Sequence, residues 1–132
     1  MRRYLILAES LWLAEQVTGI EAAVLSKAAR IDLADSALHA PSASFGRQEF
    51  YADVIDKAAV LTCRLAWNHP LPDGNKRAAW AALVLFLDLN EIVWSPDPPD
   101  GDDAEQAMLA VAAHEVDESW FADWLRQQVQ PP

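Results

Sequence analysis

Cysteine and long apolar runs are nearly absent from this sequence, and each absence excludes a class of protein. Cys63 is the single cysteine in 132 residues, so no intrachain disulfide is possible and nothing indicates a disulfide-stabilised secreted scaffold. No stretch reaches the roughly 18 uninterrupted apolar residues of a membrane-spanning helix. The apolar run near the start ends at Glu9, short of the roughly 7–15 residues of a signal peptide. We therefore expect a cytoplasmic protein with no membrane partner.

Positive charge is also scarce. The chain has 10 Lys and Arg residues against 20 Asp and Glu residues, a formal net charge of −10. Nucleic acids and anionic membranes are bound through cationic patches, so the composition argues against either as the main partner. The adjacent cations Lys76 and Arg77 therefore stand out locally and indicate a small cationic site on an acidic body.

The spacing of apolar residues predicts helices nearly throughout and an all-α fold. Apolar residues make up 52% of the chain, which is ample for the core of a single domain over residues 1–132. The helix expected at residues 21–38 could instead be broken near Arg30. Ser119 is a candidate N-cap for the helix expected at residues 119–128. The segment 92–94 is expected to be extended and 95–101 to be a loop. The expected helices are 9–17, 21–38, 53–68, 78–89, 102–113 and 119–128.

Two of these helices are expected to pack together as an antiparallel hairpin. The helix after the candidate N-cap Asp53 carries one apolar stripe at helical spacing, formed by Val54, Ala58, Leu61 and Leu65. The helix that ends near Asn90 has a corresponding face, formed by Leu83, Phe86 and Leu87. The loop between the two helices would then be held by two rigid elements.

That loop and the start of the following helix read HPLPDGNKR over residues 69–77. A helix N-terminus presents backbone N–H groups without partners and a partial positive charge, so it favours an anion. Gly74 allows close approach, Asn75 offers amide hydrogens, and Lys76 and Arg77 supply a point charge and a planar fork. These four residues predict a site for the phosphates of a nucleotide.

His69 and Asp73 precede this predicted phosphate site, and Pro70 and Pro72 keep the segment between them extended. A carboxylate beside bound phosphates is the usual protein ligand of Mg²⁺, so Asp73 is the predicted metal ligand. His69 has the side chain to accept a proton from an attacking hydroxyl, so it is the predicted general base. Taken alone, His69 would more simply cap or pack in a loop. The joint spacing of the motif favours a site.

HPLPDGNKR resembles the core motif of the Fic/Doc family, and its DGNKR form resembles the Doc branch. The resemblance covers about residues 31–91. It implies a compact helical bundle with a short β-hairpin flap before the central helix, here within residues 40–51, although composition alone fits a plain loop as well. It also implies a Mg²⁺- and nucleotide-dependent transferase that modifies a hydroxyl of a protein target, with His69, Asp73, Asn75, Lys76 and Arg77 in the roles given above.

Three departures bear on the chemistry that the resemblance implies. Nucleotidyl-transferring members usually have Gly at Lys76 and a second Arg at Trp80, so both residues point away from AMP transfer. Doc-like members with this lysine resemble kinases that transfer the terminal phosphoryl group of ATP. The resemblance of this chain to them implies a translation elongation factor as the target. Leu71 replaces the usual Phe, and we expect it to fill the same apolar pocket with a different shape.

Partners and alternatives remain open at this level. No Ser or Thr is followed four residues later by Glu, the pattern of the family's self-inhibitory helix, so we expect inhibition by a separate antitoxin protein. A protein AMP transferase and a non-enzymatic helical binding module are the alternative functions.

Trp67 and Trp80 could stack on an adenine, although their spacing favours core packing. Trp120 and Trp124 fit either the core or a docking surface.

Overall fold

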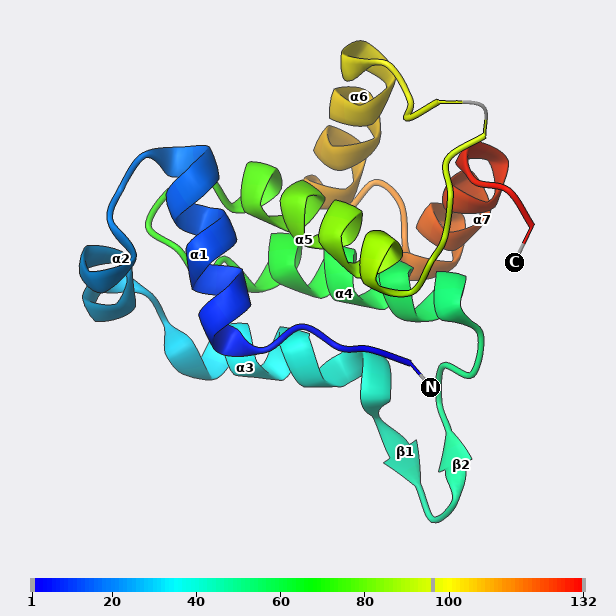
Figure 1. The fold of residues 1–132 in the computed structure, drawn as a ribbon, viewed down its shortest axis with the longest axis horizontal. Coiled ribbons are helices and arrows are strands. Elements are labelled where there is room, and N and C mark those ends of the chain that lie inside the picture. Colours follow the sequence, from blue (N-terminus) through cyan, green and yellow to red (C-terminus); the bar gives the residue numbers. More distant parts are fainter. Residues whose placement is uncertain (1, 96, 132) are drawn as a thin grey trace.

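The computed structural model describes residues 2–95 and 97–131, and its only strands in those ranges form one small hairpin (Figure 1). The prediction of an all-α bundle with a short flap is therefore confirmed. The expected helix 21–38 is broken at residues 29–30, because the backbone N–H of Arg30 donates to the Pro70 carbonyl at 2.7 Å instead of continuing the helix. The helices are α1 (Leu7–Thr18), α2 (Ala22–Ala28), α3 (Ile31–His39), α4 (Val54–Asn68), α5 (Asn75–Leu89), α6 (Gly101–Ala112) and α7 (Glu118–Gln128), with a 3₁₀ turn, η1 (Ala40–Ser42), after α3.

Helix α4 is the centre of the core. Eleven of its fifteen residues are buried, far more than the single stripe expected of a surface helix. Helix α5 packs against α4, and the predicted face of Leu83, Phe86 and Leu87 is almost completely buried. Figure 1 shows α1 beside α5, α3 beneath α4, α6 above the α4–α5 pair and α7 at the right. The predicted helical hairpin is therefore confirmed, and further helices enclose it.

The flap is a β-hairpin, not a plain loop. Strands β1 (Ser44–Phe45) and β2 (Gln48–Glu49) pair antiparallel, with Ser44 opposite Glu49 and Phe45 opposite Gln48. Gly46 has a φ of +65°, a backbone conformation that glycine adopts at no steric cost. The hairpin extends away from the helical body (Figure 1), so both strands are exposed.

A buried lysine anchors this flap to the central helix. The side chain of Lys57 is fully buried, and its Nζ donates to the carbonyl oxygen of Pro41 at 2.9 Å and to Oε1 of Glu49 at 2.8 Å. The same Nζ lies 5.3 Å from the centre of the Tyr4 ring. Burial lowers the pKa of Lys57, but its bond to Glu49 and the neighbouring Tyr4 outweigh that effect and raise the pKa overall. The ammonium group is therefore charged at neutral pH and loses its proton at a higher pH than an ordinary lysine does.

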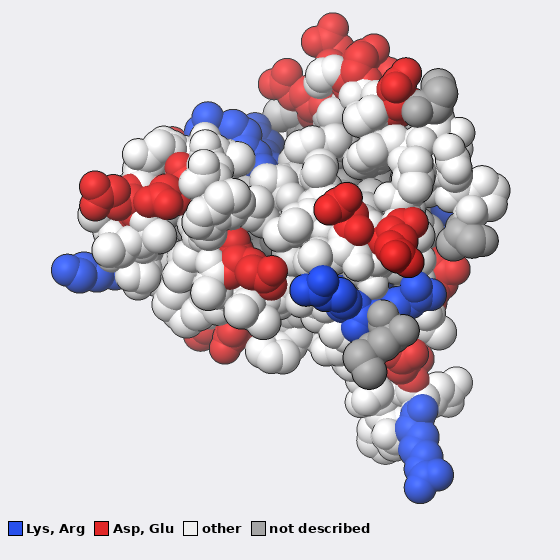
Figure 2. Space-filling model, viewed as in Figure 1, with Lys and Arg blue, Asp and Glu red and all other residues white. Residues whose placement is uncertain are grey.

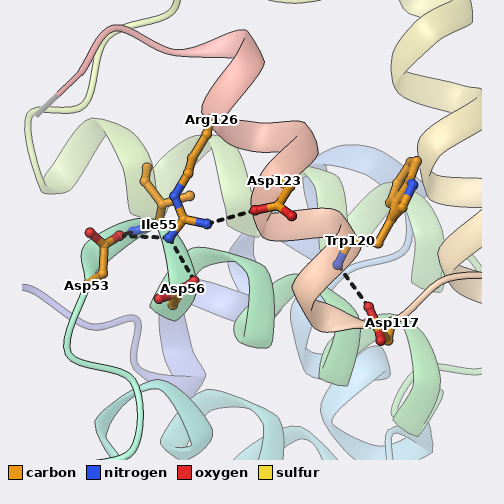
Figure 3. A network of polar contacts seen from close by, with 7 residues as sticks. All are labelled: Asp53, Ile55, Asp56, Asp117, Trp120, Asp123 and Arg126. Atoms are coloured by element: carbon orange, nitrogen blue, oxygen red, sulfur yellow. Dashed lines mark hydrogen bonds and ion pairs between the residues drawn. The ribbon is translucent and has the colours of Figure 1, made fainter.

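The C-terminal helix begins earlier than expected. Ser119 was predicted to cap it, but Asp117 is the N-cap, and its Oδ1 accepts a hydrogen bond from the Trp120 backbone N–H at 2.8 Å (Figure 3). The carboxylate lies just before the first helical residue, where it can reach an N–H that has no partner within the helix. The side chain of Arg126 farther along α7 contacts Asp53, Asp56 and Asp123 (Figure 3), which links the ends of α4 and α7.

The segment between α5 and α6 is extended around Trp94, as expected for residues 92–94. Trp94 forms an isolated antiparallel bridge with Val129, supported by bonds from Ser95 N to the Gln128 carbonyl at 2.9 Å and from Gln130 N to the Val93 carbonyl at 2.8 Å. Residues 97–100 have no helix or strand, in agreement with the expected loop, and Pro96 lies outside the described residues. Gly101 was also expected in the loop, but it is the first residue of α6. Within the described ranges, no helix has both the length and the apolar character needed to cross a bilayer.

The buried position of Lys57 predicts a larger stability effect than any single exposed ion pair. Lys57→Met keeps the length of the side chain but leaves the buried Pro41 carbonyl without its donor, which should cost about 1–3 kcal/mol of unfolding free energy. The control Arg126→Met removes a guanidinium whose contacts are solvent-exposed, and it should cost less than about 1 kcal/mol. Urea denaturation followed by circular dichroism measures both. Equal losses in the two variants would contradict the anchoring role of Lys57.

Cys63 should be unreactive in the folded protein. Burial raises the pKa of this thiol to about 12, and nearby Glu118 acts in the same direction. At pH 8 only about one thiol in ten thousand would then be ionised. A maleimide should fail to label the native protein and should label it fully in denaturant, as mass spectrometry can measure. Because the fold favours the protonated thiol, its contribution to stability should decline as the pH rises above 9.0, the ordinary value for cysteine.

Candidate functional site

The turn between α4 and α5 is bounded by two residues in the left-handed conformation. His69 follows the last residue of α4 with φ 47° and ψ 55°, and Gly74 precedes the first residue of α5 with φ 75° and ψ 19°. Left-handed residues reverse the chain sharply, which allows the antiparallel packing of the two helices across a turn of residues 69–74. The predicted site therefore lies at one end of the helical hairpin, with the His69 and Asp73 side chains exposed.

Asn75 shapes this turn through its side chain. Its Oδ1 accepts a hydrogen bond from the Leu71 backbone N–H at 2.9 Å, and its Nδ2 donates to the Leu71 carbonyl at 2.9 Å. The sequence predicted Asn75 as a phosphate donor, and nothing in its pattern indicated this paired contact. One amide hydrogen and the amide oxygen are used inside the protein, so the residue positions the loop in addition to any contact with an anion.

The first half of the turn is fastened to neighbouring helices. Pro70 is buried, and its carbonyl accepts the 2.7 Å bond from the backbone N–H of Arg30. Asn68 Nδ2 donates to the Leu33 carbonyl of α3 at 3.0 Å. Leu71 is half-buried and borders a small hollow that is also lined by Leu65, Pro70 and Ala78. Leucine therefore lies in a largely apolar setting at this place in the motif.

The start of α5 has the properties of an anion site. Gly74 provides no side-chain cap, and the first helical bond is from Ala78 N to the Gly74 carbonyl at 2.9 Å. Among the described residues, no hydrogen bond reaches the backbone N–H groups of residues 75–77. Lys76 and Arg77 are exposed there, and Figure 2 shows basic side chains gathered where α1 ends and α5 begins. Acidic groups and other basic groups are scattered over the rest of that face. Three amides and two cations thus converge at this helix end.

Gly74 is enclosed by side chains of the site itself. A Cβ atom at this position would lie 2.7 Å from Cγ2 of Thr18 and 3.5 Å from Nη2 of Arg77. The end of α1 and the Arg77 guanidinium are therefore both packed close to the Gly74 backbone. The neighbours of Gly74 are protein groups, so the close approach of a phosphate at this glycine stays a prediction.

The tryptophans near the motif have structural partners. Trp67 Nε1 donates to the Val111 carbonyl at 2.6 Å, and its ring stacks on His114 at 5.0 Å between centroids. Trp80 packs against Trp94 at 6.0 Å and Trp124 at 6.2 Å. Both tryptophans are thus part of the packed structure, as their spacing favoured. Trp80 additionally borders a cavity of about 610 Å³ that begins beside Lys76 and Arg77.

Of the two tryptophans that could belong either to the core or to a docking surface, Trp124 is at the core and Trp120 is at the surface. Trp124 is partly buried and stacks on Phe121 at 5.4 Å between ring centroids. Trp120 is 41% exposed and borders a shallow polar pocket beside His114. Trp124 therefore belongs to the edge of the core, whereas Trp120 lies at the surface.

Gly74→Ala should destabilise the protein through two separable effects. The left-handed backbone costs a residue with a Cβ about 1–2 kcal/mol, and the contact with Thr18 adds to this cost. Gly46→Ala is the matched control, because Gly46 has φ +65° but no heavy atom within 4 Å of an added Cβ. Thermal unfolding should therefore show a larger loss for Gly74→Ala.

Thr18→Ser tests how much of the destabilisation by Gly74→Ala comes from the contact with the Thr18 methyl group. It removes the Cγ2 methyl group and retains the hydroxyl that donates to the Ala14 carbonyl at 2.6 Å. In the background of Thr18→Ser, the cost of Gly74→Ala should fall to that of Gly46→Ala. An unchanged cost in the double variant would show that the crowding at Gly74 is not with Thr18.

Comparison with known proteins gives a consistent result. A sequence model of the Fic/DOC family matches residues 7–87, from the start of α1 nearly to the end of α5. A curated protein from Mycolicibacterium smegmatis named Toxin Doc is 44% identical over 85 residues, which are 64% of this chain and 65% of that protein. The chain thus matches about two thirds of the length of this relative, and the match of the family model covers more than half of the chain. The chain belongs to the Fic/Doc family.

Proposed function

We propose that the chain is a Doc-type toxin that uses ATP and Mg²⁺ to transfer a phosphoryl group to a hydroxyl of a protein. The proposal depends on one observation above all, the convergence of three backbone N–H groups with Lys76 and Arg77 at the start of α5. Such an arrangement suits a highly charged anion. The 44% identical relative is named Toxin Doc, which supports the assignment to a toxin.

The proposed reaction assigns one task to each part of the turn. His69 accepts the proton of the target hydroxyl, whose oxygen forms a bond to the γ-phosphorus of ATP. The bond from that phosphorus to the β,γ-bridging oxygen breaks, and ADP leaves. Lys76, Arg77 and the α5 amides hold the phosphate oxygens and stabilise the charge that develops on them. Asn75 keeps the turn in shape through its paired bonds with Leu71.

Asp73 is the proposed ligand of Mg²⁺. The described residues contain no group of three His, Cys, Asp or Glu side chains able to enclose a metal by themselves. A single exposed carboxylate next to a phosphate site fits Mg²⁺, which usually takes one or two protein oxygens together with phosphates and waters. When bound, the ion would neutralise phosphate charge. Asp73 would then hold the nucleotide and metal together at the start of α5.

Residues 76 and 80 favour phosphoryl transfer over AMP transfer. Lys76 adds bulk and charge to the cradle, which should alter the phosphate placed next to the hydroxyl. Trp80 packs among Trp94 and Trp124 and offers no second guanidinium at this place in the motif. Transfer of AMP therefore remains the second candidate, and a non-enzymatic binding module the third.

The proposed partners are a translation elongation factor as target and a separate antitoxin as inhibitor. The flap suits the docking of a target, because both strands are exposed and Phe45 and Phe50 are 81% and 63% exposed. Exposed strand edges readily pair with another extended chain. The anchor formed by Lys57 and Glu49 would hold the flap in register with the turn that carries His69.

Replacement of His69 by Ala should abolish the proposed transfer while leaving the fold intact. Loss of a general base lowers rates by about 10²–10⁴-fold. Cell extract treated with the protein, ATP and Mg²⁺ should show one protein with an added phosphoryl group by mass spectrometry, and the His69→Ala extract should not. The matched control is His39→Ala, because His39 is an exposed histidine at the end of α3, outside the motif.

The outcomes separate the three candidates. A nucleotide-sized adduct that depends on His69 would support AMP transfer. Growth arrest by the wild-type protein that persists in both His69→Ala and Asp73→Ala would support the binding module. A phosphoryl adduct that appears equally with His69→Ala would refute the role of His69 as the base.

A further inference from the structure

A shallow pocket of about 500 Å³ lies at the C-terminal end of α4, beside the connection between α6 and α7. Tryptophans from α4 and α7 border it, and the connection supplies the remaining residues. Neither the proposed phosphate site nor the proposed general base uses any of them, so the pocket needs a separate explanation. Its lining consists of Trp67, His114, Glu115, Val116, Asp117 and Trp120.

One wall of the pocket is held in place by the protein itself. Trp67 Nε1 donates to the Val111 carbonyl at 2.6 Å, and the His114 ring lies nearly parallel to the indole, at 5.0 Å between centroids and 16° between planes. His114 has φ +57°, at a position after α6 where glycine is the usual residue. The backbone N–H groups of His114 and Glu115 donate to the carbonyls of Val111 and Ala110, both at 3.0 Å, as in the usual turn that ends a helix. The chain therefore bears backbone strain here and keeps an imidazole stacked on Trp67.

The pocket is negatively charged. Glu115 and Asp117 line it, and among the described residues no Lys or Arg does so. The ion pairs within residues 2–95 and 97–131 include neither carboxylate. The neighbouring Glu118 differs, because Arg64 Nε donates to its Oε1 at 2.7 Å. Two carboxylates without a cation thus lie beside the exposed indole of Trp120.

An arginine side chain matches this pocket better than the other common side chains. Its planar guanidinium stacks on the face of an indole ring while its N–H groups donate to carboxylates. A lysine ammonium supplies the charge but offers no flat surface for stacking. An anion would be repelled by Glu115 and Asp117, and an apolar side chain would displace water from them without replacing its hydrogen bonds.

We propose that the pocket receives an arginine side chain of the protein target and so aligns the target beside His69. The inference rests on the proposed function, because it assigns the arginine to the target of the transfer. Trp67 lies two residues before His69 at the end of α4, so the pocket and the proposed base lie at the same end of this helix. Trp120 and the two carboxylates then set the affinity for the target and leave the chemical step to the turn.

Isosteric variants separate the charge of the pocket from its shape. Glu115→Gln combined with Asp117→Asn removes both charges, and Asn retains the ability to cap α7. Trp120→Leu keeps an apolar side chain but removes the aromatic face. The matched control combines Asp32→Asn with Asp35→Asn, which makes the same change of net charge at exposed residues of α3. Circular dichroism melts establish that each variant is folded.

The first measurement is the binding of arginine alone, followed by nuclear magnetic resonance of the tryptophan indole N–H groups in the full chain. N-acetylarginine amide should shift the Trp67 and Trp120 resonances with a Kd of about 10 mM, and its uncharged isostere N-acetylcitrulline amide should not. The affinity should fall about fivefold in the doubly neutralised variant and in Trp120→Leu, and should stay within about twofold in the control. Equal shifts with the two amides, or unchanged affinity in both pocket variants, would overturn the inference.

The second measurement tests whether the target uses the pocket. Initial rates of phosphoryl transfer are measured in a dilution series of cell extract, with ATP and Mg²⁺ in excess. The doubly neutralised variant should be about fivefold slower than the wild type in dilute extract and should approach the wild-type rate in concentrated extract, because KM for the target rises while kcat is unchanged. A rate that falls equally at every dilution, or at none, would refute the assignment of the arginine to the target.

Failure of this inference is distinguishable from failure of the proposed function. If the wild-type protein transfers a phosphoryl group but shows no preference for the arginine amide, the pocket has another role and the proposed function stands. If the wild-type protein transfers nothing, the proposed function fails, and the assignment of the pocket to the target fails with it.

Discussion

The mutual burial of α4 and α5 is the constraint on which the other features depend. Their facing apolar side chains can leave water only if the chain reverses within residues 69–74, and the left-handed backbones of His69 and Gly74 make that reversal possible. The same reversal places His69 and the start of α5 at the two ends of one short turn. Core packing thus brings the proposed base and the proposed anion site to the same end of the hairpin.

Polar side chains then hold the turn and the flap to this core. Asn75 closes the turn on Leu71, Asn68 ties it to α3, and Lys57 secures both ends of the flap. In the described part of the chain, no buried side-chain nitrogen or oxygen lacks a hydrogen-bond partner. Because an unmade bond of this kind is costly in the interior, each contact favours one arrangement of turn and flap over its alternatives.

The sequence predicted the features that follow from helical periodicity. It did not predict those that depend on a particular hydrogen-bond partner far away in the chain. The stripe with Val54 and Leu61 predicted the α4–α5 hairpin correctly, because burial follows helical spacing. Lys57 lies beside that stripe and would be expected in solvent, since no pattern shows that Pro41 and Glu49 come close enough to bind it. Ser119 was chosen as a cap where Asp117 serves, because two suitable residues stood close together. The roles of His69 and Asp73 in the site remain predictions.

The backbone of His69 has a consequence for how this protein responds to selection. With φ at 47°, the position would suit glycine better, and any residue with a Cβ bears a strain of about 1–2 kcal/mol there. Random substitution followed by screening for heat resistance should therefore enrich glycine at this codon and discard the imidazole. A population selected only for stability would lose the histidine, whereas one selected for the proposed transfer would keep it together with the less stable fold.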